Sequence, residues 1–279
     1  MKIGVIFPAS DRGMPVTELA RELEARGLES VFIPEHTHIP VDSEKTFRGG
    51  VERMPRSYAE LMDPFIACMA AASATKKLLV GTGICLVPQH DPIVLAKTVA
   101  SLDVLSDGRF VLGMGGGWNI GEMNNHRVAY ESRFAQLREH VLAMKALWTE
   151  EEAEYHGEFV DFEPVWSLPK PKQKPHPPLL LGGETDHTLR RVVEYCDGWF
   201  PRPTHGFDPE EGMARLRRIA EEANRDPASL SVTVFRLPPI KAEVERYAKA
   251  GIERGLLQFK SLKRDIILQN LDEFAGLMN

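Results

Sequence analysis

Short apolar runs without polar–apolar alternation recur along the whole chain. Such runs predict strands that are buried on both faces, as in a parallel sheet covered by helices. Eight runs fit this description: Ile3–Phe7, Ser30–Ile33, Leu78–Leu86, Arg109–Met114, Pro178–Leu181, Gly198–Phe200, Leu230–Phe235 and Gly255–Phe259. Their regular recurrence predicts an α/β fold with one strand in each repeating unit.

Segments between these runs carry apolar residues at helical spacing. Pro15 begins one such segment, and Asp91 followed by Pro92 provides a cap and a first-turn proline for another. Similar apolar stripes run over Phe134–Trp148 and over Asp265–Met278. Eight alternating units over 279 residues predict a (β/α)8 TIM barrel, taken as a single domain over residues 1–279. An open doubly wound sheet fits less well, because it needs no eighth strand.

Two stretches interrupt the alternation. Pro34–Met62, which contains Gly49 and Gly50, is a long loop after the second strand, and long loops on a scaffold are usually functional. An insertion at about 149–177 precedes the fifth strand, with a predicted hairpin around Gly157. Its proline-rich end, PKPKQKPHPP, is interpreted as a solvated, extended connector.

Composition narrows the class of partner. The chain is 43% hydrophobic and 27% charged, and its net charge of −6 gives no basic surface for nucleic acid or anionic membrane. A small-molecule substrate is therefore expected. Three cysteines, Cys68, Cys85 and Cys196, lie in apolar segments and are predicted to be inert buried thiols. With no signal peptide and no apolar run of ~20 residues, we expect a cytoplasmic protein.

The second strand is followed by two residues suited to proton transfer. His36 can donate or accept a proton near neutral pH, and Glu35 is expected to set its tautomer. A surface or structural histidine is the open alternative. His36 and His38 also suggest a metal pair, but no further ligand motif completes a site, so no metal is predicted.

Glycines gather at the ends of the third, fourth and fifth strands. Gly81 and Gly83 predict a bulge or a close backbone approach, and Gly113–Gly117 offers a floor for a flat ring system. That run is not a dinucleotide-binding fingerprint, because Trp118 stands at its third glycine. Gly182–Thr185 leads into a helix and predicts a phosphate site. Twist accommodation and an ordinary capped turn remain the alternatives.

Three segments resemble the bacterial luciferase-like superfamily of flavin and deazaflavin oxidoreductases, in its F420-dependent branch. They are GTGICLVPQHDPIVLAKTVASLDVLSDGRFVLGMGGGWN (81–119), ALWTEEEAEYHGEFVDF (146–162) and PKPKQKPHPPLLLGGETDHTLRRVVEYCDGWFP (169–201). The resemblance covers nearly the whole chain. It implies a barrel with an insertion before strand five, a homodimer, and a cofactor ring at the carboxyl end of the strands.

The resemblance also implies which residues form the site. A non-proline cis peptide is expected at Gly83-Ile84, and His36 with Glu35 is expected near the reacting carbon. The implied cofactor-binding residues are Gly83, Ile84, Gly115, Gly116, Gly117, Trp118, Asn119, Gly182, Gly183, Glu184 and Thr185. Two positions depart from relatives: Gly116 stands where true luciferases have an arginine, and Trp118 replaces an acid of the sugar-phosphate dehydrogenases.

The function expected is hydride transfer between F420 and an organic substrate that the sequence does not identify. The alternative is an FMN-dependent monooxygenase that uses reduced flavin and O2. Two further hypotheses are a metal-dependent hydrolase using His36 and His38, and a catalytically silent subunit. A glutamyl tail on F420 requires basic residues at the mouth, for which Lys170, Lys172, Lys174 and Arg202 are the candidates, and a solvated charged face explains these residues equally well. The substrate pocket is expected to involve Tyr58, Trp118, Phe207 and the 34–62 loop.

Overall fold

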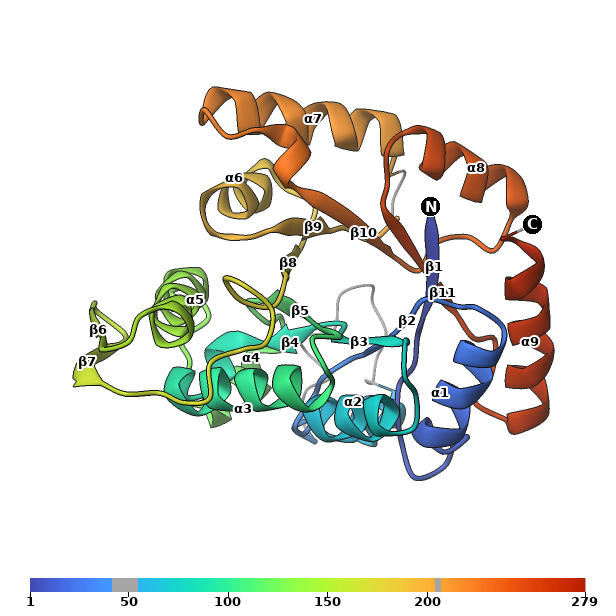
Figure 1. Ribbon diagram of the computed structural model, residues 1–279, viewed down its shortest axis with the longest axis horizontal. Coiled ribbons are helices and arrows are strands. Elements are labelled where there is room, and N and C mark those ends of the chain that lie inside the picture. The colour runs from blue at the N-terminus through green and yellow to red at the C-terminus, as the bar shows by residue number, and fades with distance from the viewer. Residues whose placement is uncertain (42–54, 204–206, 279) are drawn as a thin grey trace.

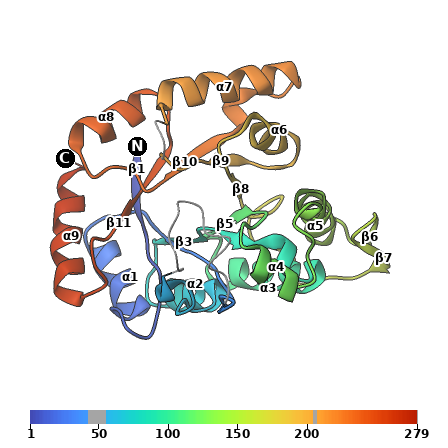
Figure 2. The same cartoon turned by 180° about the vertical axis from the view of Figure 1, so that it is seen from behind.

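The structure, a computed structural model, describes residues 1–41, 55–203 and 207–278. Parallel strands form a ring, and helices surround it on the outside (Figures 1 and 2). The central part of the loop expected over Pro34–Met62, including Gly49 and Gly50, lies outside the described residues.

The main sheet has the strand order β3-β2-β1-β11-β10-β9-β8-β5-β4. Its strands are β1 (Lys2–Ile6), β2 (Ser30–Ile33), β3 (Leu79–Thr82), β4 (Cys85–Leu86), β5 (Phe110–Gly115), β8 (Leu179–Gly182), β9 (Gly198–Phe200), β10 (Ser231–Phe235) and β11 (Arg254–Gln258). An additional pairing of β3 with β5 closes the ring, and all pairings in it are parallel. Because β3 and β4 together supply the third position, the sheet is an eight-stranded barrel.

The predicted TIM barrel is thus confirmed, and each of the eight predicted strands is present. One detail differs: the run expected over Leu78–Leu86 is two strands, divided at Gly83-Ile84. The peptide bond between these two residues is cis, as the resemblance implied. The bulge expected from Gly81 and Gly83 therefore lies at the carboxyl end of β3.

Apolar side chains fill both sides of the ring. A small cluster within it comprises Ile6, Phe32, Val111, Leu180, Phe200 and Leu256, with Ile84 and Phe235 packed against it. A larger cluster lies between the sheet and the helices. Side chains alternate along each strand, so β1, β2, β5, β8, β9 and β11 contribute to both clusters, which explains their unbroken apolar pattern.

The helices and turns outside the ring are α1 (Val16–Ala25), η2 (Arg56–Tyr58), α2 (Pro64–Ser73), η3 (Val87–Gln89), α3 (Pro92–Leu105), α4 (Ile120–Asn125), α5 (Arg133–Thr149), α6 (Asp186–Tyr195), α7 (Pro209–Glu222), η4 (Pro227–Ser229), α8 (Lys241–Lys249) and α9 (Arg264–Gly276). Helices were predicted at α1, α3, α5, α6 and α9. The sequence pattern did not indicate α4, which is only six residues long. Among the described residues, no helix has the length and apolarity needed to cross a membrane.

The predicted hairpin of the insertion is present as β6 (Ala153–His156) paired antiparallel with β7 (Asp161–Val165). It lies beside α5 at the edge of the molecule (Figures 1 and 2). The following proline-rich segment was predicted to be solvated, and only part of it is: Pro169, Lys172, Lys174 and Pro175 are exposed, whereas Pro171, His176 and Pro177 are buried. Gln173 donates from its backbone N at 2.8 Å and its side-chain Nε2 at 2.7 Å to the buried carboxylate of Asp103.

Two lysines of this segment, Lys170 and Lys172, are also held away from the barrel mouth. Lys172 pairs with Asp107, which follows the carboxyl end of α3 and so precedes the amino end of β5. Lys170 donates to the carbonyls of Leu147 and Glu150 at the end of α5. Parallel strands have all their amino ends at one rim, so these lysines lie at the rim opposite the expected cofactor.

A buried ion pair lies near the amino ends of β2, β10 and β11. Arg254 donates to both carboxylate oxygens of Glu29, from Nε and Nη2, each at 2.7 Å, and Nη1 reaches Thr233 at 3.1 Å. Burial alone would raise the pKa of Glu29, but the hydrogen bonds and charge of Arg254 lower it overall. We expect Arg254→Ala to destabilise the fold by roughly 3 kcal/mol, at the lower end for buried pairs, because it leaves Glu29, whose side chain is 22% exposed, unpaired.

Urea unfolding at pH 7 measures this effect, with Lys2→Ala as the control at an exposed ion pair. Since the folded-state pKa of Glu29 is lowered, its contribution is present above the ordinary carboxyl pKa and is lost as pH falls through the lowered one. The difference between wild type and Arg254→Ala should therefore shrink in acid. Equal midpoints for both proteins at pH 7 would contradict the assignment.

Candidate active site at the carboxyl ends of the strands

The tips of the third, fourth and fifth barrel strands converge on one side chain, that of Ile84. A Cβ built on Gly115 would collide with Ile84 Cδ1, and one built on Gly182 would lie 3.7 Å from the same atom. Strand pairing gives the same arrangement, since β4 and β8 both pair with β5. Glycine at these positions therefore lets the Ile84 side chain pack directly against the main chain of β5 and β8.

Polar atoms next to this floor are buried without a hydrogen-bond partner among the described residues. They include both side-chain amide atoms of Gln89, Nδ2 of Asn119 and Nε of Arg133. A Cβ on Gly117, which has a φ of +82°, would lie 3.6 Å from Gln89 Nε2. Buried polar groups are nearly always hydrogen-bonded in folded proteins, so these atoms point to a polar ligand. The residues present fit a flat ring with polar edges and a phosphate.

Two arginines lie beside Gly116. The guanidinium carbons of Arg133 and Arg191 lie 4.4 Å and 4.1 Å from the centroid of the Phe134 ring, and that ring comes within 2.9 Å of a Cβ built on Gly116. Arg133 belongs to α5 and Arg191 to α6. The fold thus brings the positive charges of two arginines close to Gly116, although the residue at position 116 is itself uncharged.

The turn predicted to bind phosphate is the start of α6. Thr185 is its N-cap, and its Oγ1 accepts from the backbone N of Thr188 at 3.2 Å. Gly183 has a φ of +126°, which a side chain would disfavour, and its carbonyl accepts from Trp199 Nε1 at 2.6 Å. The geometry is that of a helix N-terminus exposed at the strand ends, to which anions are attracted.

Glu184 in the same turn has a different role from its neighbours. Its Oε1 accepts from the backbone N of Arg202 at 3.1 Å, and the Arg202 side chain is 3.6 Å away. Arg202 follows β9, so it does lie at the mouth of the barrel. Its charge is already paired there.

His36 is paired with a carboxylate that was not predicted. Its Nδ1 lies 2.7 Å from Oε2 of Glu122, and the other oxygen of Glu122 accepts from the backbone N of Thr37 at 3.1 Å. Glu122 is fully buried on α4, whose N-cap is Asn119. An ionised Glu122 keeps the proton of a neutral His36 on Nδ1, which leaves Nε2 as the atom able to accept one.

Aromatic side chains surround His36. The ring of Trp118 meets it edge-on at 5.5 Å, and the ring of Tyr58 lies 5.4 Å away. Both were predicted to line the substrate pocket, and the structure brings them together with His36. Phe207 was predicted there too, but it packs on Trp199 and Tyr247 instead, at 5.7 and 6.2 Å.

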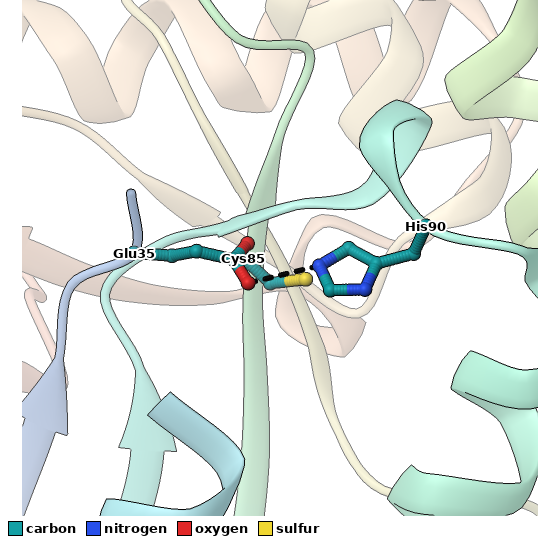
Figure 3. A group of neighbouring side chains, drawn as sticks. All are labelled: Glu35, Cys85 and His90. Carbon is teal, nitrogen blue, oxygen red and sulfur yellow. Dashed lines mark hydrogen bonds and ion pairs between the residues drawn. The ribbon is translucent and has the colours of Figure 1, made fainter. Parts of the chain in front are cut away.

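Glu35 does not orient His36, so that expectation is corrected. One oxygen of Glu35 accepts from the backbone N of Leu86 at 2.5 Å, and the other lies 2.9 Å from Nε2 of His90. Figure 3 shows the carboxylate pointing toward His90, with the sulfur of Cys85 beside it. Glu35 therefore connects the end of β2 to the segment that follows the Gly83-Ile84 bulge. Its hydrogen bonds go to that segment, whereas His36 pairs with Glu122.

Glu35, Cys85 and His90 place three potential metal-ligating atoms within 4.8 Å of one another. Burial raises the pKa of the Cys85 thiol well above its ordinary value, and the charge of Glu35 adds to this. Burial would lower the pKa of His90, but the hydrogen bond and charge of Glu35 raise it overall. The Cys85 thiol therefore stays protonated, and His90 and Glu35 form a hydrogen-bonded pair beside it. All three cysteines are buried, as predicted.

The second histidine of the suggested metal pair faces away from His36. His38 contacts Oγ1 of Thr37 at 2.9 Å through Nδ1 and Asn125 Nδ2 at 2.8 Å through Nε2. His126 contacts the same Thr37 hydroxyl at 2.8 Å. Among the described residues, His36 and His38 take part in no group of three possible metal ligands.

Comparison with known proteins agrees with this geometry. The family model for luciferase-like monooxygenases matches residues 4–274. An uncharacterized protein of Mycobacterium tuberculosis is 37% identical over 279 residues, which is 99% of this chain and 98% of that protein. The FMNH2-dependent dimethylsulfone monooxygenase of Pseudomonas putida is 30% identical over 186 residues, covering 65% of this chain and 49% of the relative.

A likeness in structure extends to an enzyme with another cofactor. The F420-dependent tetrahydromethanopterin reductase of Methanopyrus kandleri superposes with a TM-score of 0.76 at 15% identity, over 99% of this chain and 97% of the other. At that identity the likeness establishes the fold alone. The relatives thus include both flavin- and deazaflavin-dependent enzymes. On the match over nearly its full length, the chain belongs to the luciferase-like monooxygenase family.

Proposed function

We propose that this protein is an F420-dependent oxidoreductase that transfers a hydride between the deazaflavin and an organic substrate. The observation that carries the proposal is the convergence of side-chain-free main chain around Ile84, beside the unpartnered polar atoms of Gln89 and Asn119. Trp118 connects this floor to His36, because it follows the glycine run and contacts the imidazole ring. A cofactor seat and a proton-handling group therefore lie side by side.

The deazaflavin, when bound, accepts or supplies the hydride. In the direction of alcohol oxidation, the substrate carbon gives up a hydride, its hydroxyl gives up a proton, and a carbonyl forms. His36 Nε2 takes that proton, and the imidazolium is stabilised by Glu122 at 2.7 Å from Nδ1. Tyr58 and Trp118 exclude water from one side of the imidazole. Carbonyl reduction runs through the same steps in reverse.

We assign the cofactor phosphate to the first turn of α6 and to Arg133. The Gly182–Thr185 turn offers helix N-terminal amides, and the unpartnered Nε of Arg133 lies beside Gly116. Arg133 thereby supplies the positive charge that true luciferases carry within the glycine run. Gly83, Ile84, Gly115, Gly117 and Asn119 then form the ring floor.

An FMN-dependent monooxygenase is the second candidate, favoured by the FMNH2-dependent relative. The glycine floor accommodates either ring, so cofactor affinity decides between them. Titration with F420 and with FMN, followed by fluorescence quenching, tests the assignment. Tight F420 binding with weak FMN binding supports the first candidate, the reverse supports the second, and binding of neither contradicts both.

The same titration with a variant at Arg133 tests whether this residue binds the cofactor phosphate. We expect Arg133→Gln to weaken F420 binding by roughly 10- to 100-fold, since a hydrogen bond to a charged group contributes about 1.5–3 kcal/mol. Affinity for the phosphate-free deazaflavin riboside should stay unchanged. Arg138→Gln, on the same helix and in an exposed ion pair with Glu194, is the control. Equal losses for both ligands would show that Arg133 supports the fold instead of the phosphate.

A further inference from the structure

Arg236 has an unusual backbone conformation for its place in the barrel. Four described residues other than glycine have a positive φ: Asp107, Arg127, Arg236 and Asn224. Three of them follow the ends of α3, α4 and α7, where the left-handed conformation commonly terminates a helix. Arg236, at φ +59°, instead follows β10 at the carboxyl end of the seventh barrel strand. Strained residues at such positions tend to be functional.

The side chain of Arg236 lies over aromatic rings that lead to the bulge. Its guanidinium carbon is 5.3 Å from the centroid of the Phe235 ring, which is 5.9 Å from that of Phe200. Phe200 in turn lies 3.8 Å from a Cβ built on Gly83. Arg236 is exposed, and within the part of the chain that the structure describes no carboxylate pairs with it. Two rings therefore separate an uncompensated positive charge from the proposed ring site.

The neighbouring loop adds positive charge. β10 and β11 pair in parallel with Phe235 opposite Leu256, so the loops that follow them emerge side by side. Residues 236–240 and 259–263 contain no acidic residue but include Arg236, Lys260 and Lys263. Lys260 pairs with Glu273 at 3.1 Å, whereas Lys263 has no acidic partner among the described residues. These two loops form a basic rim at the mouth, which we call the β10–β11 rim.

We propose that the β10–β11 rim binds an anionic group of the substrate, a phosphate or a carboxylate. Barrel enzymes often bind phosphate at the loops after the seventh and eighth strands. The cofactor phosphate is assigned to the turn after β8 and to Arg133, so the rim is a separate anion site. The inference rests on the proposed function for its identification of the ligand as substrate. A glutamyl tail on F420 is the other source of such an anion.

Inorganic phosphate is the probe for this site. Isothermal titration of the protein loaded with its cofactor measures phosphate affinity while the cofactor occupies the first anion site. We expect Arg236→Gln to weaken phosphate binding about tenfold, and Arg236→Gln with Lys263→Gln to weaken it further. Arg217→Gln, an exposed arginine on α7, is the control and should bind phosphate like wild type. Unchanged affinity in the double variant would overturn the proposal.

A second arm separates the two sources of the anion. Affinity for F420 with a long glutamyl tail is compared with affinity for the riboside that lacks both phosphate and tail. Equal effects of Arg236→Gln on both, each near zero, support a substrate site. Selective loss of affinity for the tailed cofactor would assign the rim to the cofactor and overturn the proposal.

The same design distinguishes failure of the proposed oxidoreductase function from failure of the rim proposal. If neither F420 nor FMN binds, phosphate is titrated into the Arg133→Gln variant, in which the first anion site is weakened. Phosphate binding that still depends on Arg236 would support an anion site on the rim while the oxidoreductase assignment fails. Loss of that dependence would overturn the rim itself.

Discussion

We expect turnover to fall by about 10²- to 10⁴-fold when His36 is replaced by Ala, which is the usual contribution of a positioned general acid or base. The expected loss is in kcat, because His36 is proposed to handle the substrate proton and does not belong to the proposed ring floor. Cofactor affinity, measured by fluorescence quenching, should remain that of wild type. His36 is almost fully buried and contacts Tyr58, Trp118 and Glu122. The expected loss of turnover is therefore assigned to the His36 side chain alone.

Two further variants test whether the loss of turnover is specific to the His36 imidazole. His36→Gln keeps much of the side-chain volume without a titratable nitrogen and should lose turnover to a similar extent. His38→Gln, at a partly exposed histidine that contacts Asn125, is the matched control and should retain wild-type turnover. Wild-type kcat in His36→Ala would remove this residue from the mechanism and leave the cofactor assignment untouched.

Glu122→Gln should lower kcat by about 10²-fold, at the lower end of what general acid–base catalysis contributes. The amide has the same shape as the carboxylate and can still accept from the backbone N of Thr37, but it carries no charge. It therefore neither fixes the proton on Nδ1 nor stabilises the imidazolium that forms at His36. In the proposed mechanism Glu122 is a positioning residue, because it acts through His36.

The measurement separates this role from a structural one. Loss of kcat with unchanged KM and unchanged cofactor affinity supports positioning, whereas a parallel fall in unfolding midpoint and cofactor affinity would indicate that Glu122 maintains the fold. Combining Glu122→Gln with His36→Ala should add little to the single His36 change, since both act on one proton. The control is Glu131→Gln, at an exposed glutamate just before α5.

The barrel was predictable because its signal is local. Each strand of a closed parallel barrel is buried on both faces, so it appears as a continuous apolar run wherever it occurs, and β9 was found although it has only three residues. The break of the third strand at Gly83-Ile84 could be suspected from glycine but not from apolar periodicity. The short helix α4 has too few residues to display an apolar stripe.

Glycines that mark close main-chain approaches can be recognised in the sequence, whereas contacts between side chains across the fold cannot. Glycine at positions 115 and 182 marks a close approach in the sequence itself. The partner of His36 lies 86 positions away, on a helix without periodicity, and no local pattern indicates it. Glu35 was chosen because it is adjacent in sequence, but neighbouring residues at a strand end point in different directions. Arg133 directly precedes the apolar stripe of α5 and gave no separate signal.

The floor around Ile84 has a consequence for cofactor exchange during divergence or engineering. In the proposed seat, peptide groups without side chains would present the same surface to any planar tricycle, so substitutions elsewhere would alter the reaction without rebuilding the seat. Selectivity between an isoalloxazine and its 5-deaza analogue would then depend on the few polar atoms at the edge of the proposed seat, including the amides of Gln89 and Asn119. A redesign aimed at swapping one redox carrier for the other should begin at those two amides.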